Sequence, residues 1–176
     1  MPKHDEHPKT NAMRALDQRH IAYTPFYYSD AIHSAQEVAA LLGVAPGLVF
    51  KTLVALTNDN RQLLIMVPGD RELDLRLAAK GAGAKAVHMA LQRDAERLTG
   101  LKVGGISPLA LLGRRFEVFL DAPGAALDEL YLNGGQRGVN VRLRVADLLT
   151  VTGAKVIEAS QPGATDEAAG EETAGE

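Results

Sequence analysis

The sequence contains no cysteine, and this absence excludes several kinds of site. Without thiols the chain has no disulfide framework, no thiolate zinc centre and no cysteine nucleophile. Its five histidines are scattered and lack the spacing of metal ligands, so we expect neither a metal nor another cofactor. The lack of cysteine also fits a reducing compartment, and we expect a cytoplasmic protein.

Long hydrophobic runs are missing as well. No apolar segment approaches the roughly 20 residues that cross a bilayer, and the N-terminus has no basic and apolar leader. We therefore expect a soluble protein with no membrane partner. The chain has 176 residues, of which 46% are hydrophobic and 23% charged, which is typical of one globular domain with terminal tails.

The net charge of -3 arises at the C-terminus, where residues 160–176 hold five carboxylates and no Lys or Arg. The rest of the chain has 19 basic and 17 acidic side chains, a charge of +2. A nearly neutral body with local basic clusters is compatible with nucleic-acid binding but does not require it. Because they lack core-forming residues, we predict that 159–176 and the polar residues 1–9 are disordered.

Helical and strand patterns alternate without regular βαβ repeats. Thr10 and Ser34 are typical N-caps, and Gly43 is a natural end for the second helix. Pro25 places the aromatic strand 22–28 at a sheet edge or a bulge. Other helices are predicted at 73–80, 92–98 and 146–151, and other strands at 48–56, 62–68, 85–89, 114–120, 129–132, 139–143 and 154–157. The pattern predicts an α+β fold with a mixed or antiparallel sheet.

Lys51 stands near the start of the apolar strand 48–56. Burial disfavours an ammonium group unless it finds acceptors or its pKa falls. Either Lys51 extends from the strand end into water, or its side chain lies in a functional pocket. The sequence of the strand alone favours neither interpretation.

Two loops are rich in glycine, at 104–108 and 134–138. Glycines let backbone amides approach a ligand, so the first loop is either a tight structural turn or a donor site for an ester carbonyl or oxyanion. The second loop is a hairpin connection or, through Arg137, an anion site. Neither is a P-loop, because no Gly-Lys-Ser/Thr follows.

Charged side chains also cluster. Lys102, Arg114 and Arg115, with the loop arginine, form either a phosphate-binding rim or ordinary solvated surface. The acids at 70, 72 and 74 precede a predicted helix, where they complement its dipole, and we interpret them as capping residues rather than catalytic ones.

Four segments carry a resemblance to a known family and occur in this order: 49–53, 104–108, 121–123 and 134–138. The chain resembles the YbaK family of aminoacyl-tRNA deacylases. These are relatives of the editing domain of bacterial prolyl-tRNA synthetase, and the resemblance covers residues 10–158. It implies a mixed, largely antiparallel, barrel-like sheet flanked by helices. It also implies a trans-editing enzyme for mischarged Cys-tRNA(Pro), with Cys-tRNA(Cys) as a further substrate, and prolyl-tRNA synthetase as a partner besides tRNA.

The resemblance assigns roles by residue. The implied catalytic residues are Lys51, Gly104 and Gly105, with the glycine loop holding the aminoacyl carbonyl. The implied substrate-binding residues are Tyr28, Thr52, Ile106, Ser107, Pro108, Asn133, Gly134, Arg137 and Asn140. With no protein nucleophile, the implied chemistry is substrate-assisted: the cysteine thiol of the substrate attacks its own ester.

Asn140 and Asn133 stand where the family has aspartate and serine. This departure leaves open a deacylase for another mischarged tRNA, such as Ala-tRNA(Pro). A module that binds tRNA or a synthetase without cleaving the ester is a further alternative, which the presence of both Lys51 and the 104–108 loop disfavours.

Overall fold

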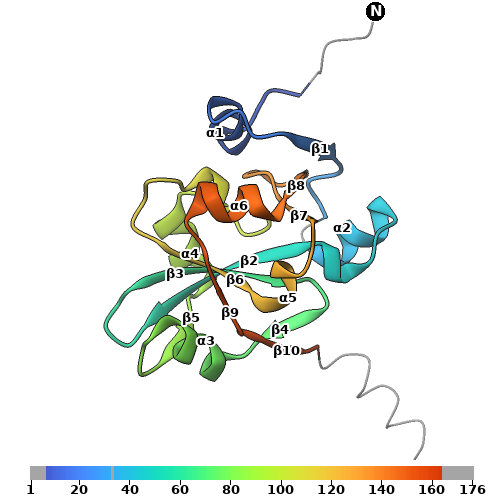
Figure 1. The fold of residues 1–176 in the computed structure, drawn as a ribbon. Coiled ribbons are helices and arrows are strands. Elements are labelled where there is room, and N and C mark those ends of the chain that lie inside the picture. Colours follow the sequence, from blue (N-terminus) through green and yellow to red (C-terminus); the bar gives the residue numbers. More distant parts are fainter. Residues whose placement is uncertain (1–6, 33, 164–176) are drawn as a thin grey trace, which may run out of the picture.

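A computed structural model of the chain describes residues 7–32 and 34–163. The helices are α1 (Asn11–Gln18), α2 (Ala35–Leu42), α3 (Leu75–Ala82), α4 (Gln92–Thr99), α5 (Ala122–Ala125) and α6 (Val145–Thr152), with 3₁₀ turns η1 (Pro46–Leu48) and η2 (Pro108–Ala110) (Figure 1). The strands are β1 (Tyr23–Tyr27), β2 (Phe50–Thr57), β3 (Gln62–Pro68), β4 (Arg71–Leu73), β5 (Val87–Met89), β6 (Glu117–Asp121), β7 (Glu129–Asn133), β8 (Val139–Arg144), β9 (Lys155–Ile157) and β10 (Ser160–Pro162).

These strands form three sheets. The largest has the order β5-β2-β3-β6-β9, with antiparallel pairs around β2 and parallel pairs on both sides of β6. A second sheet has the antiparallel order β1-β8-β7, and β4 pairs with β10 in a third. The predicted α+β class with mixed, largely antiparallel strands is confirmed, although the described strands form open sheets rather than a closed barrel.

Helices cover the five-stranded sheet from both sides, with α1 and α6 above and α3 below in Figure 1. Below, small side chains of α3 such as Ala78 pack on Leu63 and Ile65 of β3. Above, Met66 of β3 joins the core beneath α1, α6 and the β1-β8-β7 sheet. Burial of β3 on both faces explains its continuously apolar sequence. None of the helices in the described ranges is long and apolar enough to cross a membrane.

Local signals define several boundaries as predicted. Thr10 Oγ1 accepts from the Met13 amide at 3.2 Å, and Ser34 Oγ accepts from the Glu37 amide at 3.1 Å. Gly43 ends α2 with a φ of 70°. Strand β1, which contains the predicted edge proline, pairs with β8 alone.

Three short elements were not predicted: β4, β10 and the single turn α5. A buried carboxylate joins two of them. Asp121, 1% exposed, accepts from the Ala122 amide at 3.1 Å, from the Ala159 amide at 2.9 Å and from the Ser160 hydroxyl. Residues 159–163 are therefore part of the fold, and the prediction that they are disordered is wrong.

The predicted N-terminal tail is also shorter than expected. The His7 ring stacks on the Tyr27 ring with 4.0 Å between centroids, so residues 7–9 contact the fold. The remaining predicted tail residues, 1–6 and 164–176, lie outside the described residues.

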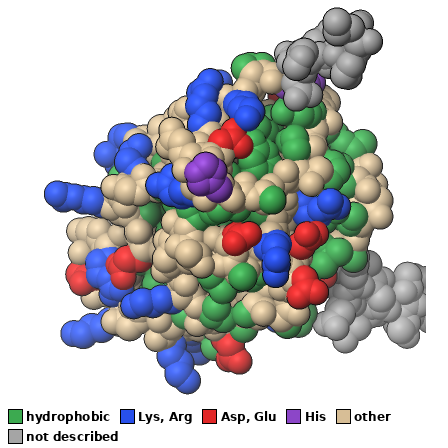
Figure 2. Space-filling model, turned by 45° about the horizontal axis from the view of Figure 1, so that its top comes forward, with side chains coloured by type: hydrophobic (Ala, Val, Ile, Leu, Met, Phe, Trp, Pro, Cys, Tyr) green, Lys and Arg blue, Asp and Glu red, His purple; other side chains and the backbone are tan. Residues whose placement is uncertain are grey.

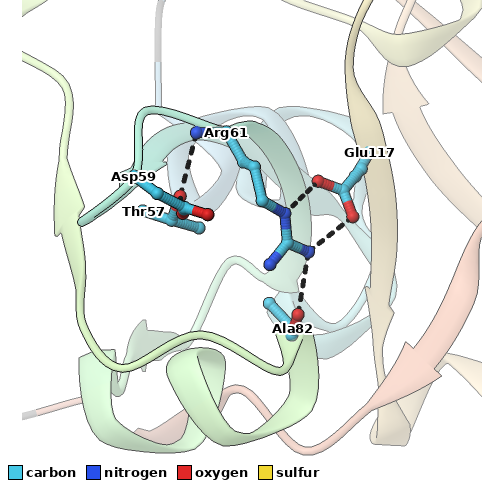
Figure 3. A network of polar contacts seen from close by, with 5 residues as sticks. All are labelled: Thr57, Asp59, Arg61, Ala82 and Glu117. Carbon is cyan, nitrogen blue, oxygen red and sulfur yellow. Dashed lines mark hydrogen bonds and ion pairs between the residues drawn. The ribbon is translucent and has the colours of Figure 1, made fainter.

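A polar network holds the β2–β3 hairpin to its neighbours (Figure 3). Arg61 donates to both carboxylate oxygens of Glu117 on β6, at 2.7 and 2.6 Å, and to the Ala82 carbonyl of α3 at 2.8 Å. The Arg61 amide also donates to Thr57 Oγ1 at 2.9 Å. The network fixes the sheet at the end of β2. Lys51 lies at the opposite end, among the first residues of this strand.

Candidate active site

A cavity of about 530 Å³ lies beside the first half of β2. The other walls come from Ser34 and the first half of α2, the β4 turn, the start of α4, the loop at 103–106, and residues of β7 and β8. Strand β5 pairs only with Ala55, Leu56 and Thr57, so the preceding edge of β2 has no strand partner and opens into the cavity. Seven of the predicted site residues line this cavity: Tyr28, Lys51, Thr52, Gly104, Ile106, Asn133 and Asn140.

The other predicted residues do not line the cavity but support its walls. Ser107 is buried, and its Oγ accepts from the Leu109 amide at 3.2 Å, which caps η2 at the buried Pro108. The Gly105 amide donates to the Lys102 carbonyl at 2.7 Å. Gly105 is therefore not available as an oxyanion donor, contrary to the prediction, and the amides of Gly104 and Ile106 remain as the candidates.

The two glycine-rich loops, far apart in sequence, pack into one unit. A Cβ on Gly105 would lie 2.9 Å from the Arg137 nitrogen, so only glycine permits this approach. Asn133 Nδ2 donates to the Gly104 carbonyl at 2.7 Å, and Arg137 Nε donates to the Val103 carbonyl at 2.7 Å. Asn133 and Arg137 thus position the loop that lines the cavity, and Gly134 belongs to the same supporting turn.

Lys51 lies on β2 opposite Val67 of β3 and is half-buried. Burial lowers the pKa of its ammonium group, while the nearby carboxylates of Glu72 and Asp70 oppose this shift. Desolvation has the larger effect because the cation lies at the cavity wall and forms no ion pair at contact distance with the part of the chain that the structure describes. An ammonium group held in this way is available to an anionic ligand.

The acids near β4 divide into two roles. Asp74 caps α3 as predicted, accepting from the Arg76 and Leu77 amides at 3.0 and 3.1 Å. Asp70 and Glu72 instead line the cavity with Lys51, so interpreting all three acids as caps was wrong. Spacing alone could not reveal this, because strand β4 had not been predicted.

Two buried polar atoms in the cavity wall have no hydrogen-bond partner among the residues that the structure describes: Thr52 Oγ1 and Asn140 Oδ1. Asn140 is 3% exposed, and its side chain bonds to the Tyr28 hydroxyl, which partly offsets the rise in the Tyr28 pKa that burial causes. An unsatisfied buried acceptor costs about 1–3 kcal/mol. A ligand that donates a hydrogen bond to Asn140 would recover this energy.

Basic residues contact or lie beside the segment 98–103 that leads into the cavity loop, but they are not among the residues that line the cavity. Arg114 donates to the Leu98 carbonyl at 3.1 Å, and Arg137 contacts Val103, next to Lys102. We call Lys102, Arg114, Arg115 and Arg137 the basic flank. Figure 2 shows many Lys and Arg side chains along one side of the molecule, whereas acidic ones also lie toward the middle of this face.

Comparison with known proteins agrees with this fold. Residues 29–151 match the aminoacyl-tRNA editing domain family. A protein of Enterococcus faecalis, named "Putative Cys-tRNA(Pro)/Cys-tRNA(Cys) deacylase EbsC", is 34% identical over 160 residues, which cover 90% of this chain and 97% of that protein. A proline–tRNA ligase of Aquifex aeolicus is 28% identical over 75 residues, or 43% of this chain and 13% of the ligase.

Solved structures show the same fold. The hypothetical protein APE2540 superposes with a TM-score of 0.80 at 26% identity, over 86% of this chain and 100% of that one. A structure described as "a putative trans-editing enzyme for prolyl tRNA synthetase" gives 0.74 at 25% identity, over 88% and 99% of the two chains. The chain belongs to the aminoacyl-tRNA editing domain family, and this confirms the predicted family and enzyme class.

Proposed function

We propose that this chain is a trans-editing deacylase that hydrolyses Cys-tRNA(Pro), with Cys-tRNA(Cys) as a second substrate. The main support is the cavity itself, whose lining includes Lys51 together with Gly104 and Ile106 of the glycine-rich loop. Its described lining contains no cysteine or histidine that would serve as nucleophile or base. The 34% identity to the Enterococcus protein named for these two substrates supports the same proposal.

In the proposed mechanism Lys51 neutralises the phosphate of the terminal nucleotide and orients the ester. The Gly104 and Ile106 amides stabilise the oxyanion, a role worth about 3 kcal/mol for each donor. The substrate thiol attacks its own ester carbonyl, and the thiol proton is transferred to the departing ribose 3′ oxygen. The products are free tRNA and a cyclic thioester of cysteine, which water then opens to cysteine.

The basic flank supports a contact with the RNA backbone next to the cavity, because clustered Lys and Arg side chains favour phosphates. Similarity to short parts of proline–tRNA ligases supports a partnership with prolyl-tRNA synthetase, which would deliver the mischarged tRNA. In this proposal the synthetase provides the tRNA selectivity that a nearly neutral body lacks.

A panel of tRNA(Pro) charged with cysteine, alanine or proline tests the proposal. We expect rapid release of cysteine and little release of the other two, since only cysteine carries a thiol. Equal turnover of Ala-tRNA(Pro) would refute thiol assistance and identify a deacylase of different specificity. Binding of tRNA without turnover of any ester would refute the deacylase.

A further inference from the structure

Asp70 and Glu72 form an acidic wall on one side of the cavity. They flank Arg71, the first residue of β4, which also lines the cavity but forms no ion pair with them in the described structure. Its Nε donates to Ser160 Oγ at 2.7 Å, and its terminal nitrogen donates to the Ser160 carbonyl at 3.3 Å. Side chains alternate along a strand, so within β4 the Arg71 guanidinium is directed away from the Glu72 carboxylate, while Asp70 lies in the turn before the strand.

The acidic wall forms no ion pair at contact distance with any residue that the structure describes. The ion pairs among the described residues involve neither Asp70, Glu72 nor Lys51. Both acidic residues are exposed and line the cavity, where their carboxylates interact electrostatically with the half-buried lysine. The wall therefore presents two negative charges that a cationic ligand can approach.

The fold holds this wall in place. A Cβ on Gly69 would lie 2.8 Å from the Ala35 Cβ and 3.0 Å from the Val49 carbonyl, so the turn before Asp70 packs closely against α2 and β2. In the β4–β10 ladder Glu72 pairs with Gln161. Because β10 is in turn anchored to buried Asp121, the carboxylates stand on a rigid support.

An independent observation indicates that the occupant of the cavity donates hydrogen bonds. Asn140 is more than nine-tenths buried, and its amide is directed toward Tyr28, which leaves Oδ1 without a partner in the same cavity wall. The cavity thus combines an unsatisfied acceptor with two carboxylates. A ligand group rich in N–H donors and positively charged fits both features.

We propose that Asp70 and Glu72 bind the free α-ammonium group of the aminoacyl ester, so that the enzyme selects substrates with an unblocked amine. The inference rests on the proposed function of the pocket. The charged end of an aminoacyl-tRNA matches the cavity, because its phosphate faces Lys51 and the basic flank while its ammonium faces the acidic wall. N-acylated esters would lose this contact and leave the carboxylates unpaired.

Binding of a non-hydrolysable analogue tests the wall apart from catalysis. The analogue is 3′-cysteinylamino-3′-deoxyadenosine, in which an amide replaces the ester, compared with its N-acetyl form by calorimetry. We expect the wild-type protein to bind the free amine at least about 10-fold more tightly, as for a charge-assisted hydrogen bond. In the D70N/E72Q variant this preference should fall to about twofold or less, while affinity for the acetylated form stays unchanged.

The D128N/E158Q variant is the matched control, because both acids are exposed and neither lines the cavity. It makes the same change in net charge and should keep the wild-type preference. Equal binding of both analogues by the wild-type protein, binding of neither, or a preference retained in D70N/E72Q would overturn the proposal. Binding with the expected preference but no release of cysteine from Cys-tRNA(Pro) would support the wall and refute the deacylase.

Discussion

Replacement of Lys51 by methionine should remove activity while leaving the fold intact or slightly more stable. The two side chains are similar in length, so the substitution removes the charge with little change in packing. An ammonium and a phosphate 4 Å apart interact by about 4 kcal/mol at an effective dielectric constant of 20. Since each 1.36 kcal/mol is a factor of about ten in rate, kcat/KM for Cys-tRNA(Pro) should fall by about 10²–10³.

Stability should change in the opposite direction. Burial lowers the pKa of Lys51, so the charged form opposes folding at neutral pH, and this penalty disappears as the pH rises past the ordinary value of 10.5. A half-buried methyl group in place of the ammonium adds about 0.5 kcal/mol of hydrophobic stabilisation. For a chain of this size that raises Tm by about 1–2 °C.

The assay measures release of radiolabelled cysteine and, in parallel, thermal unfolding by circular dichroism. Lys85→Met is the matched control, since Lys85 is exposed and does not line the cavity. It should retain wild-type activity. A Lys51→Met enzyme with kcat/KM within about threefold of wild type would refute the assigned role, because it corresponds to less than about 0.7 kcal/mol.

Three further predictions concern the support of the site. Gly105→Ala should lower stability by about 1–3 kcal/mol and reduce activity, because its Cβ would press on the Arg137 backbone nitrogen at 2.9 Å. Asp121→Ala should lower Tm by about 6–12 °C, since several buried donors lose their acceptor at about 1 kcal/mol or more each. Glu117→Gln should cost about 0.5–1 kcal/mol at pH 7, as for a partly exposed ion pair. Arg61 lowers the Glu117 pKa, so this difference should vanish as the pH falls well below 4.5.

Thermal and urea unfolding measure all three effects. Gly47→Ala is the control for the glycine, since its Cβ would meet Asp70 at an ordinary 3.6 Å, and Asp128→Ala is the control for the buried acid. A neutral Gly105→Ala would mean that the two loops do not pack as described. A stable Asp121→Ala protein would contradict the anchoring of β10. A Glu117→Gln effect that persists at pH 3 would exclude the ion pair as its cause.

Much of the fold is predictable because its signals are local. Caps at Thr10 and Ser34 and the stop at Gly43 act within one helical turn, and the long apolar strands β2 and β3 are joined by a short hairpin loop. The family resemblance likewise depends on short runs of residues. For the site, the sequence indicated Lys51 and the 104–108 loop as candidates. A lysine in an apolar strand and a pair of adjacent glycines are both unusual features that can be recognised within a short stretch of sequence.

Long-range contacts determined what the sequence left open. Strands β4 and β10 have three residues each and are distant in sequence, yet they pair in one ladder, and the Arg71 side chain donates to Ser160, 89 positions away. That pairing changed the interpretation of Asp70 and Glu72 from helix caps to a cavity wall. In the described structure the Gly105 amide donates to the Lys102 carbonyl, whereas Asn140 Oδ1 has no hydrogen-bond partner. The sequence alone thus indicated the family and singled out Lys51 as the candidate functional cation. Only the packing of distant segments decided which neighbouring groups are free to act, because hydrogen-bond satisfaction depends on partners that no local pattern specifies.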